Sequence, residues 1–138
     1  MSRAVLARQL DLDPDRAWAL IILHSTTRGS SDPADEMRQA EAAIGDRQAV
    51  WFTPCHDPGR EAYLRPGQML SVTNLQWRSL LYEADVLIGN SSSIIIEAPF
   101  VGLKTVEIGR RQEGRDRVPY GDGKSVPRIV EVLRQWAP

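Results

Sequence analysis

Three consecutive serines stand where an apolar run gives way to a polar turn, in Gly89-Asn-Ser-Ser-Ser93. Val86–Ile88 before them has the composition of a strand, and the residues after them that of a helix. Free backbone N–H groups and the helix dipole at such a start attract anions, and the serine hydroxyls add donors for phosphate oxygens. A plain helix cap is the alternative interpretation, although one Asn or Ser suffices for it. The sequence leaves phosphate binding and capping both open.

Two single residues near this turn could also do chemistry. Glu97 follows three isoleucines, and an unpaired carboxylate buried there would be costly, so we expect it to face a cleft or solvent. In a cleft it could accept hydrogen bonds from two ribose hydroxyls. His24 ends the apolar run Trp18–Leu23 and could contact a diphosphate or act as an acid or base near pH 7. A solvated glutamate and a structural histidine are the alternatives.

The other polar segments differ in how specifically they indicate a binding or catalytic function. Arg110–Arg117 carries net positive charge and could clamp a diphosphate or a nucleobase, although most charge runs are solvated loops. Cys55-His56-Asp57 does not predict a catalytic triad, because adjacent side chains rarely converge on one point. These three residues are too few for a closed metal site, so we expect no metal. Thr27–Ser30 lacks the G-x-G-x-x-G pattern of dinucleotide sites.

Apolar runs and amphipathic stretches alternate along the chain. Strands are expected at residues 18–23, 49–52, 69–72, 86–88 and 105–108. Helices are expected at 33–44, from Asn74 to 84, from 93 to 98 and at 124–136. The first of them would be capped by Asp32, with Asp35 and Glu36 in its first turn, and the second would be capped by Asn74. This alternation predicts an α/β fold: a single Rossmann-like three-layer domain with a parallel sheet of about five strands.

The expected strand order, 3-2-1-4-5, makes strands 1 and 4 neighbours at the point where the winding reverses. Ligands of such sheets bind beyond the carboxyl ends of the strands at that point. There, His24 follows strand 1 and the Gly89–Ser93 turn follows strand 4. Topology therefore places His24 beside the serines.

Composition limits the class of protein. The 138 residues suit one domain, 1–138, and 42% hydrophobic with 25% charged residues is ordinary for a globular protein. A formal net charge of -1 gives no electrostatic case for nucleic-acid binding. The longest apolar run, Trp18–Leu23, is too short to cross a membrane, and the N-terminal residues lack the apolar core of a signal peptide. We expect a cytoplasmic protein without a membrane partner.

Three segments together resemble the C-terminal half of UDP-N-acetylglucosamine 2-epimerases, and of their hydrolysing branch in particular. They are Ala84–Ser93, Ile95-Ile-Glu-Ala-Pro99 and Ile108-Gly-Arg-Arg-Gln-Glu-Gly-Arg115. The corresponding family patterns are roughly G-N-S-S-S-G-I-I-E-A-P and N-I-G-x-R-Q-x-G-R. The resemblance extends from about Ala17 onward.

The resemblance implies half of a two-domain glycosyltransferase-B fold, with the active site in the cleft between the domains and no cofactor. It implies that Ser91 and Ser92, with Asn90 and Ser93 in the same turn, bind the UDP diphosphate. It further implies that Glu97 binds the ribose and Arg111 the nucleotide. His24, the one catalytic candidate, would meet the phosphate or sugar, and the backbone near Val72 would meet the uracil.

The chain also departs from the family pattern. Ile94 replaces a frequent glycine, Cys55 a frequent asparagine and Ser25 a frequent proline. In the family, the carboxylates that move the substrate proton come largely from the N-terminal half, which has no counterpart here.

We therefore expect a UDP-binding or UDP-sugar-binding domain of amino-sugar metabolism. Alone it would be inactive as an isomerase or hydrolase, needing a separate N-terminal-half chain or a homodimer. A stand-alone nucleotide-sugar-binding module and the C-terminal domain of a glycosyltransferase are the alternatives.

Overall fold

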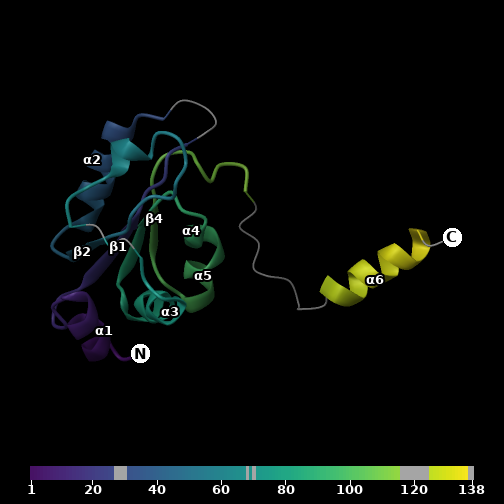
Figure 1. Cartoon of the computed structure of the whole chain (residues 1–138), viewed down its shortest axis with the longest axis horizontal. Coiled ribbons are helices and arrows are strands. Elements are labelled where there is room, and N and C mark those ends of the chain that lie inside the picture. Colours follow the sequence, from purple (N-terminus) through teal and green to yellow (C-terminus); the bar gives the residue numbers. More distant parts are fainter. Residues whose placement is uncertain (27–30, 68, 70, 116–124, 137–138) are drawn as a thin grey trace.

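The computed structural model describes residues 1–26, 31–67, 69, 71–115 and 125–136. Four parallel strands form one sheet in the order β2-β1-β3-β4 (Figure 1). They are β1 (Trp18–Ile22), β2 (Gln48–Trp51), β3 (Val86–Gly89) and β4 (Thr105–Glu107). The helices are α1 (Arg3–Leu10), α2 (Pro33–Ile44), the 3-10 turn η1 (Arg60–Tyr63), α3 (Asn74–Glu83), α4 (Ser93–Ile96), α5 (Ala98–Val101) and α6 (Ser125–Trp136).

The expected order of the strands is confirmed, and the count of five is one too high. The segment expected as the third strand pairs only at Met69, which forms a parallel bridge with Phe52 beyond β2. Its amide donates to the Trp51 carbonyl over 2.9 Å, and its carbonyl accepts from Thr53 over 3.0 Å. Within the described residues the chain then turns to Thr73, which caps α3, so this edge position holds a single bridge.

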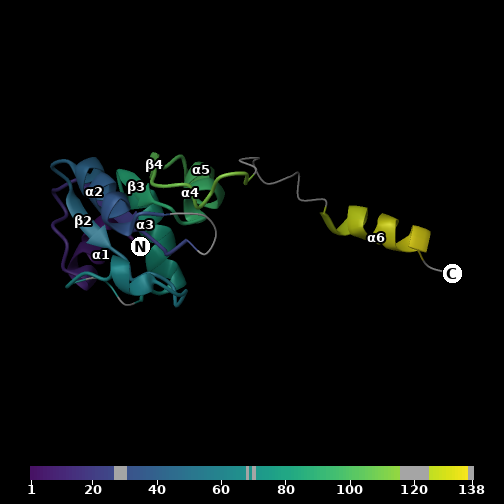
Figure 2. The same cartoon turned by 90° about the horizontal axis from the view of Figure 1, so that it is seen from above.

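The core lies on both faces of the sheet. All five residues of β1 are buried, as a strand covered on both sides requires. Leu20 packs on one face with buried side chains of α1, α3, α4 and α5 (Leu6, Leu80, Leu81, Ile94 and Ala98). Ile21 packs on the other with Ala40 of α2 and Tyr63 of η1. Figure 2 shows the helices flanking the sheet. The fold is therefore a Rossmann-like three-layer α/β domain.

Capping chemistry sets where the helices begin. The Asp32 carboxylate accepts from the Ala34 and Asp35 amides over 3.0 and 3.2 Å, so α2 begins where the sequence predicts. The predicted Asn74 cap of α3 is wrong by one residue. Thr73 is the cap, because its hydroxyl and the Gln76 side chain form a reciprocal capping box.

The predicted helix after the serines is divided into two short ones. α4 ends at Ile96 and α5 begins at Ala98, with Glu97 between them. Pro99 has no N–H to donate to the preceding turn and its ring crowds the carbonyl four residues earlier, so a continuous helix is interrupted here.

α6 occupies the residues predicted for the last helix. The Thr27–Ser30 segment and residues 116 and 117 of the charged run lie outside the described residues. No helix within the described ranges is long and apolar enough to cross a membrane.

Candidate functional site

The two central strands meet most closely where both end. In the parallel register of β1 and β3, Ile22 is opposite Gly89. A Cβ on Gly89 would lie 1.9 Å from the Ile22 carbonyl oxygen, and φ is +144°. Only glycine fits there. This close approach brings the residues after both strands together.

The Asn90 side chain connects the two strand ends by hydrogen bonds. Its Oδ1 accepts from the His24 amide over 2.7 Å, and its Nδ2 donates to the His24 carbonyl over 2.8 Å. The Asn90 side chain is fully buried. The expectation that His24 lies beside the serine turn, drawn from topology, is therefore confirmed.

A buried carboxylate lies behind Asn90. Glu36 Oε2 accepts from the Tyr63 hydroxyl over 2.7 Å and from Asn90 Nδ2 over 3.4 Å. Burial raises the pKa of Glu36, while the two hydrogen bonds oppose that shift. Burial and the bond to Glu36 raise the pKa of Tyr63 to about 12. A Cβ on Gly109, at φ +65°, would come within 2.3 Å of Glu36 Oε1, so the chain after β4 packs directly on this carboxylate.

The His24 ring is held in one orientation by a hydrogen bond from the backbone. Its Nδ1 accepts from the Cys55 amide over 3.0 Å. Burial and the nearby Arg111 lower the pKa of His24, and Asp57 partly opposes this. The ring is therefore neutral at pH 7. Because Nδ1 is the acceptor, the proton is on Nε2, which is a hydrogen-bond donor.

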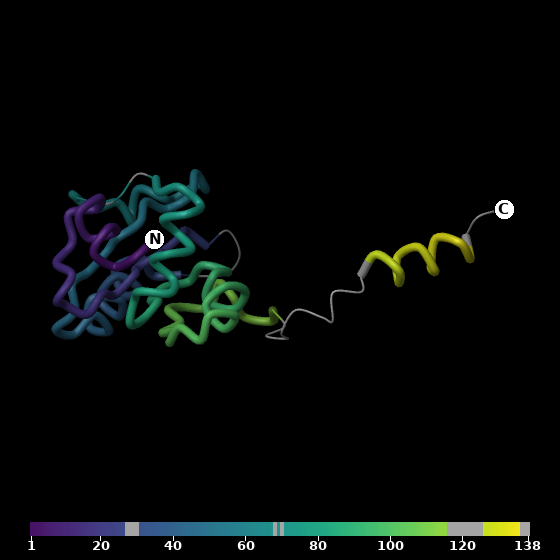
Figure 3. Tube along the Cα trace, turned by 90° about the horizontal axis from the view of Figure 1, so that it is seen from below, coloured from purple at the N-terminus to yellow at the C-terminus, as the bar shows by residue number. Residues whose placement is uncertain are grey.

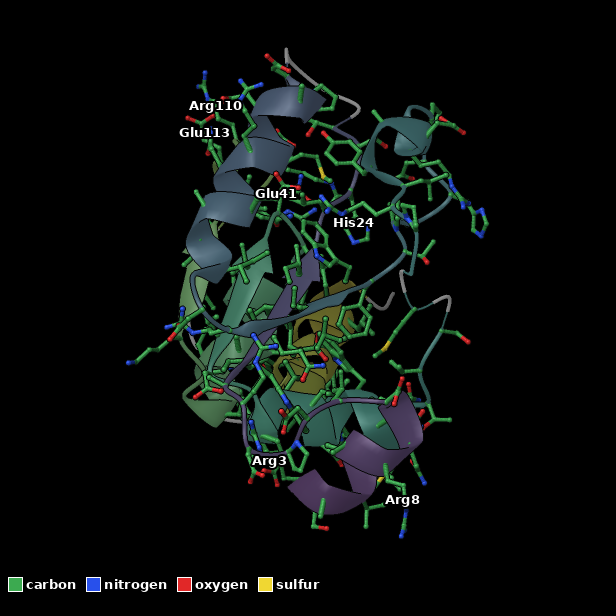
Figure 4. The ribbon with its side chains drawn as sticks, turned by 90° about the vertical axis from the view of Figure 1, so that its left-hand side faces the viewer. Arg3, Arg8, His24, Glu41, Arg110 and Glu113 are labelled. Carbon is green, nitrogen blue, oxygen red and sulfur yellow. The ribbon has the colours of Figure 1, made fainter. Side chains whose placement is uncertain are left out.

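Arg111 is anchored at the same edge. Its Nε donates to the Ser25 carbonyl over 3.3 Å and its Nη1 to the Asn90 carbonyl over 3.5 Å. Its Nη2 lies 3.5 Å from Asp57 Oδ2. The neighbouring Arg110 is instead paired with Glu113 over 2.7 Å at the outer surface, as Figure 4 shows. Of these two arginines, only Arg111 is directed at the strand ends.

The Cys55–Asp57 segment supports this arrangement rather than forming a triad. The Cys55 thiol donates to Asp57 over 2.9 Å, and burial, followed by that bond, raises the thiol pKa. The same bond is the main reason that the pKa of Asp57 is lowered. His56 contacts Arg60 instead. Within the described part of the chain, no group of three His, Cys, Asp or Glu side chains could hold a metal ion.

Hydroxyl and amide groups with no partner gather at this edge. Ser92 precedes α4 but forms no side-chain cap, and Ser91 Oγ lies 3.4 Å from the amide and the hydroxyl of Ser93. Across the described residues, three buried side-chain atoms have no hydrogen-bond partner: Ser25 Oγ, Thr26 Oγ1 and Gln112 Oε1. Gln112 Nε2 donates to the Asn90 carbonyl over 2.6 Å, which fixes its place beside Arg111.

Sequence reasoning singled out neither Ser25 and Thr26 nor Asp57 and Gln112 as site residues. The signal for the first two was their position directly after the strand end, beside His24. Gln112 lies next to Arg111 within the motif Arg111-Gln-Glu-Gly-Arg115.

Glu97 contacts Trp77, and Val72 lies just before the Thr73 cap of the helix that carries Trp77. Glu97 Oε1 accepts from the Trp77 indole N–H over 2.8 Å. Val72 and Trp77 pack against the same core cluster. Glu97 also lines a cavity of about 320 Å³ between α3 and α5. It therefore faces a cleft, one of the two expected environments. The backbone of α4 joins Glu97 to the serine turn.

Residues 2–118 match the family described as UDP-N-acetylglucosamine 2-epimerase. The chain belongs to this family. It is also 29% identical, over 128 residues, to a protein of Legionella pneumophila subsp. pneumophila (strain Philadelphia 1) named UDP-N,N'-diacetylbacillosamine 2-epimerase (hydrolyzing). That match covers 84% of this chain and 34% of the relative, so this epimerase-family chain spans about a third of the relative's length.

Proposed function

We propose that this domain binds UDP or a UDP-sugar at the carboxyl edge of its sheet. The observation that carries the proposal is the set of unpartnered buried polar groups beside Arg111, in a member of a UDP-sugar epimerase family. Buried hydroxyls without a partner are costly, and phosphate oxygens would accept from them. A guanidinium held in place by three neighbours has little freedom left to lose on binding a diphosphate.

Each residue of the edge has a role in this proposal. The hydroxyls of the three serines donate hydrogen bonds to phosphate oxygens; these are Ser91, Ser92 and Ser93. His24 donates its Nε2–H to the phosphate or sugar as a neutral imidazole. Asn90, being fully buried, acts as a positioning residue through its two bonds to the His24 backbone.

The nucleoside lies toward Trp77 in this arrangement. Glu97 uses Oε1 for the indole N–H, which leaves Oε2 to accept from the ribose hydroxyls. The uracil then meets the backbone near Val72, just before the Thr73 cap of α3. The indole thereby orients the carboxylate, a role that the sequence analysis did not assign to Trp77.

We further propose that catalysis needs a second domain in addition to the one described here. Epimerisation and UDP release require a base within about 2.6–3.2 Å of the sugar proton and an acid at the leaving group. The two acid–base candidates that the sequence analysis singled out, His24 and Glu97, are both assigned to the nucleotide in this proposal. The activity of the whole enzyme, its amino-sugar substrate and a cytoplasmic location stay predictions.

Calorimetric titration with UDP, ATP and NAD tests the binding. We expect UDP to bind most tightly, with a dissociation constant of about 0.1–1 mM, because the contacts proposed here all come from a single domain. Arg111→Ala should weaken binding by about 1–3 kcal/mol, the value for hydrogen bonds to charged groups. Arg110→Ala, the matched control one residue away, should leave it unchanged. Equal effects of the two variants, or tighter binding of ATP or NAD, would contradict the proposal.

Two further measurements separate the parts of the proposal. Ser91→Ala and Glu97→Ala should each weaken UDP binding by about 1–3 kcal/mol. An unchanged affinity in Glu97→Ala would mean that this carboxylate does not bind ribose. The purified chain should release no UDP from UDP-N-acetylglucosamine. Release that His24→Ala abolishes would show that this chain assembles a whole active site.

A further inference from the structure

An apolar groove runs between α3 and α5. Its exposed apolar side chains are Tyr82 of α3 (70% exposed), Ile96 of α4 (40%) and Phe100 of α5 (77%). Leu81 and Val101 line it as well, with Arg78 and Glu97 as its charged members. Three large apolar side chains so exposed on adjoining elements mark a surface that another element covers.

α6 carries an apolar stripe that matches such a groove. Val126, Ile129, Val130 and Leu133 follow the spacing of one helix face, and each is 37–69% exposed. Gln135 lies on the opposite face. Isolated helices of about 12 residues are marginal in water, and packing of an amphipathic face supplies most of their stability. The 12 residues of α6 therefore need a partner surface to stay helical.

We propose that α6 docks its Val126–Leu133 stripe into the groove between α3 and α5 of its own chain. In Figures 1 and 3 the segment before residue 116 leaves the domain on the side of α4 and α5. The ten Cα–Cα steps from residue 115 to residue 125 span at most about 35 Å. A 100-residue domain has a radius of gyration of about 13 Å, so this tether reaches the groove.

The charges at the two surfaces are compatible. α6 carries an ion pair of its own, Glu131 with Arg134 at 3.9 Å, outside the Val126–Leu133 stripe. α6 also carries Arg128, and the groove holds one residue of each sign, Arg78 and Glu97. Docking therefore brings no excess of like charge together. The family match ends at residue 118, so α6 is not covered by it. The docking does not require nucleotide binding, but Glu97 lines the groove, so a docked α6 would compete with the ribose that we propose this carboxylate binds.

A short tether favours the groove of the same chain over that of a second copy. Short linkers give effective concentrations in the millimolar range, well above micromolar chain concentrations. Docking within one chain is therefore independent of concentration.

Hydrogen exchange of the full chain, followed by mass spectrometry, tests the docking. We expect the α6 amides to exchange at least about tenfold more slowly than in an undocked helix, at two chain concentrations about fiftyfold apart. Leu133→Asp in the stripe and Tyr82→Asp in the groove should each abolish this protection. Gln135→Asp on the polar face and Leu64→Asp, at an exposed apolar side chain outside the groove, are the matched controls and should preserve it.

Three outcomes would overturn the proposal. One is rapid exchange of α6 in the unaltered chain. Another is that Leu133→Asp loses the protection of α6 while Tyr82→Asp keeps it, which would mean that α6 packs elsewhere. The third is protection that appears only at the higher concentration, which would assign the groove to a second copy. Exchange of the β1 amides serves as an internal check that each variant is folded.

Discussion

Asn90→Asp replaces one atom at the centre of the site and should be strongly destabilising at neutral pH. The Asn90 Nδ2 donates to the His24 carbonyl over 2.8 Å and lies 3.4 Å from Glu36 Oε2. A carboxylate oxygen in the same place would face two acceptors and could donate to neither. The change keeps the size of the side chain, so packing is preserved and the electrostatic effect is isolated.

The expected magnitude follows from burial. The position is fully buried, and an uncompensated buried charge costs about 3–5 kcal/mol. When the introduced carboxyl is protonated, its O–H can still donate to the His24 carbonyl. The cost then falls to about 1 kcal/mol, the scale of one hydrogen bond.

The sign of the pH dependence follows from the same contacts. Burial and Glu36 raise the pKa of the introduced carboxyl in the folded state above its unfolded value of about 3.9. Between the two pKa values the folded state binds more protons than the unfolded state. Stability of the variant relative to the unaltered chain therefore falls as pH rises above about 4.

Urea denaturation at acidic and at slightly alkaline pH measures the effect. The loss in free energy of unfolding should grow from about 1 to about 3–5 kcal/mol between pH 4 and pH 8. Asn90→Ala removes the hydrogen bonds without adding a charge. Its cost should change less between the two pH values than that of Asn90→Asp, because it alters titration only through Glu36, which loses one long hydrogen bond. A pH-independent loss in Asn90→Asp would refute the placement of the amide between His24 and Glu36.

Two further results are expected. Gly109→Ala should lower the free energy of unfolding by about 1–3 kcal/mol more than Gly114→Ala. Both glycines have positive φ, but a Cβ added at Gly109 would lie 2.3 Å from Glu36 Oε1, whereas one added at Gly114 would meet no atom within 4 Å. Equal urea midpoints would contradict this packing. An NMR titration should give His24 a pKa below 6.5, and Asp57→Asn should lower it further, because the carboxylate opposes the shift. A midpoint above 6.5 would contradict the burial of the ring.

The strand order was accessible from the sequence because few topologies satisfy its pattern. The apolar run at Trp18 and the one at Val86 are each followed by a polar turn and a helix. Parallel pairing with right-handed crossovers then makes them neighbours. The placement of His24 beside Asn90 follows from this order alone, without any knowledge of side chains.

The elements that the sequence did not predict correctly, the third strand and α1, depend on short-range detail. Met69 pairs by a single bridge at the sheet edge, and an apolar run of four residues does not show how many of them pair. α1 was not expected at all. It is eight residues long, with Leu6 and Ala7 as its buried side chains, too few to give a clear helical period.

The polar network around the site was beyond the reach of sequence patterns. Glu36 has the position of an acidic residue in the first turn of a helix, which suits the helix dipole on a solvated surface. In the fold it is 4% exposed, because Tyr63 and Asn90 converge on it from two other elements. The pairing of Asp57 with Arg111 likewise joins loops 54 residues apart, at a distance that only the assembled sheet edge defines.

The hydrogen bonds between Asn90 and His24 also have a consequence for how the domain folds. The residues it joins are 66 positions apart, and β1 and β3 pair across a similar separation. Closing a loop of that length costs roughly 4 kcal/mol in chain entropy, before any pairing energy is gained. Local hairpins cannot supply this contact, since every strand pair in the sheet is parallel. Partly folded chains, with helices formed but β1 and β3 apart, therefore lack the sheet edge that we propose binds UDP. UDP binding would then report on completed folding rather than on compactness.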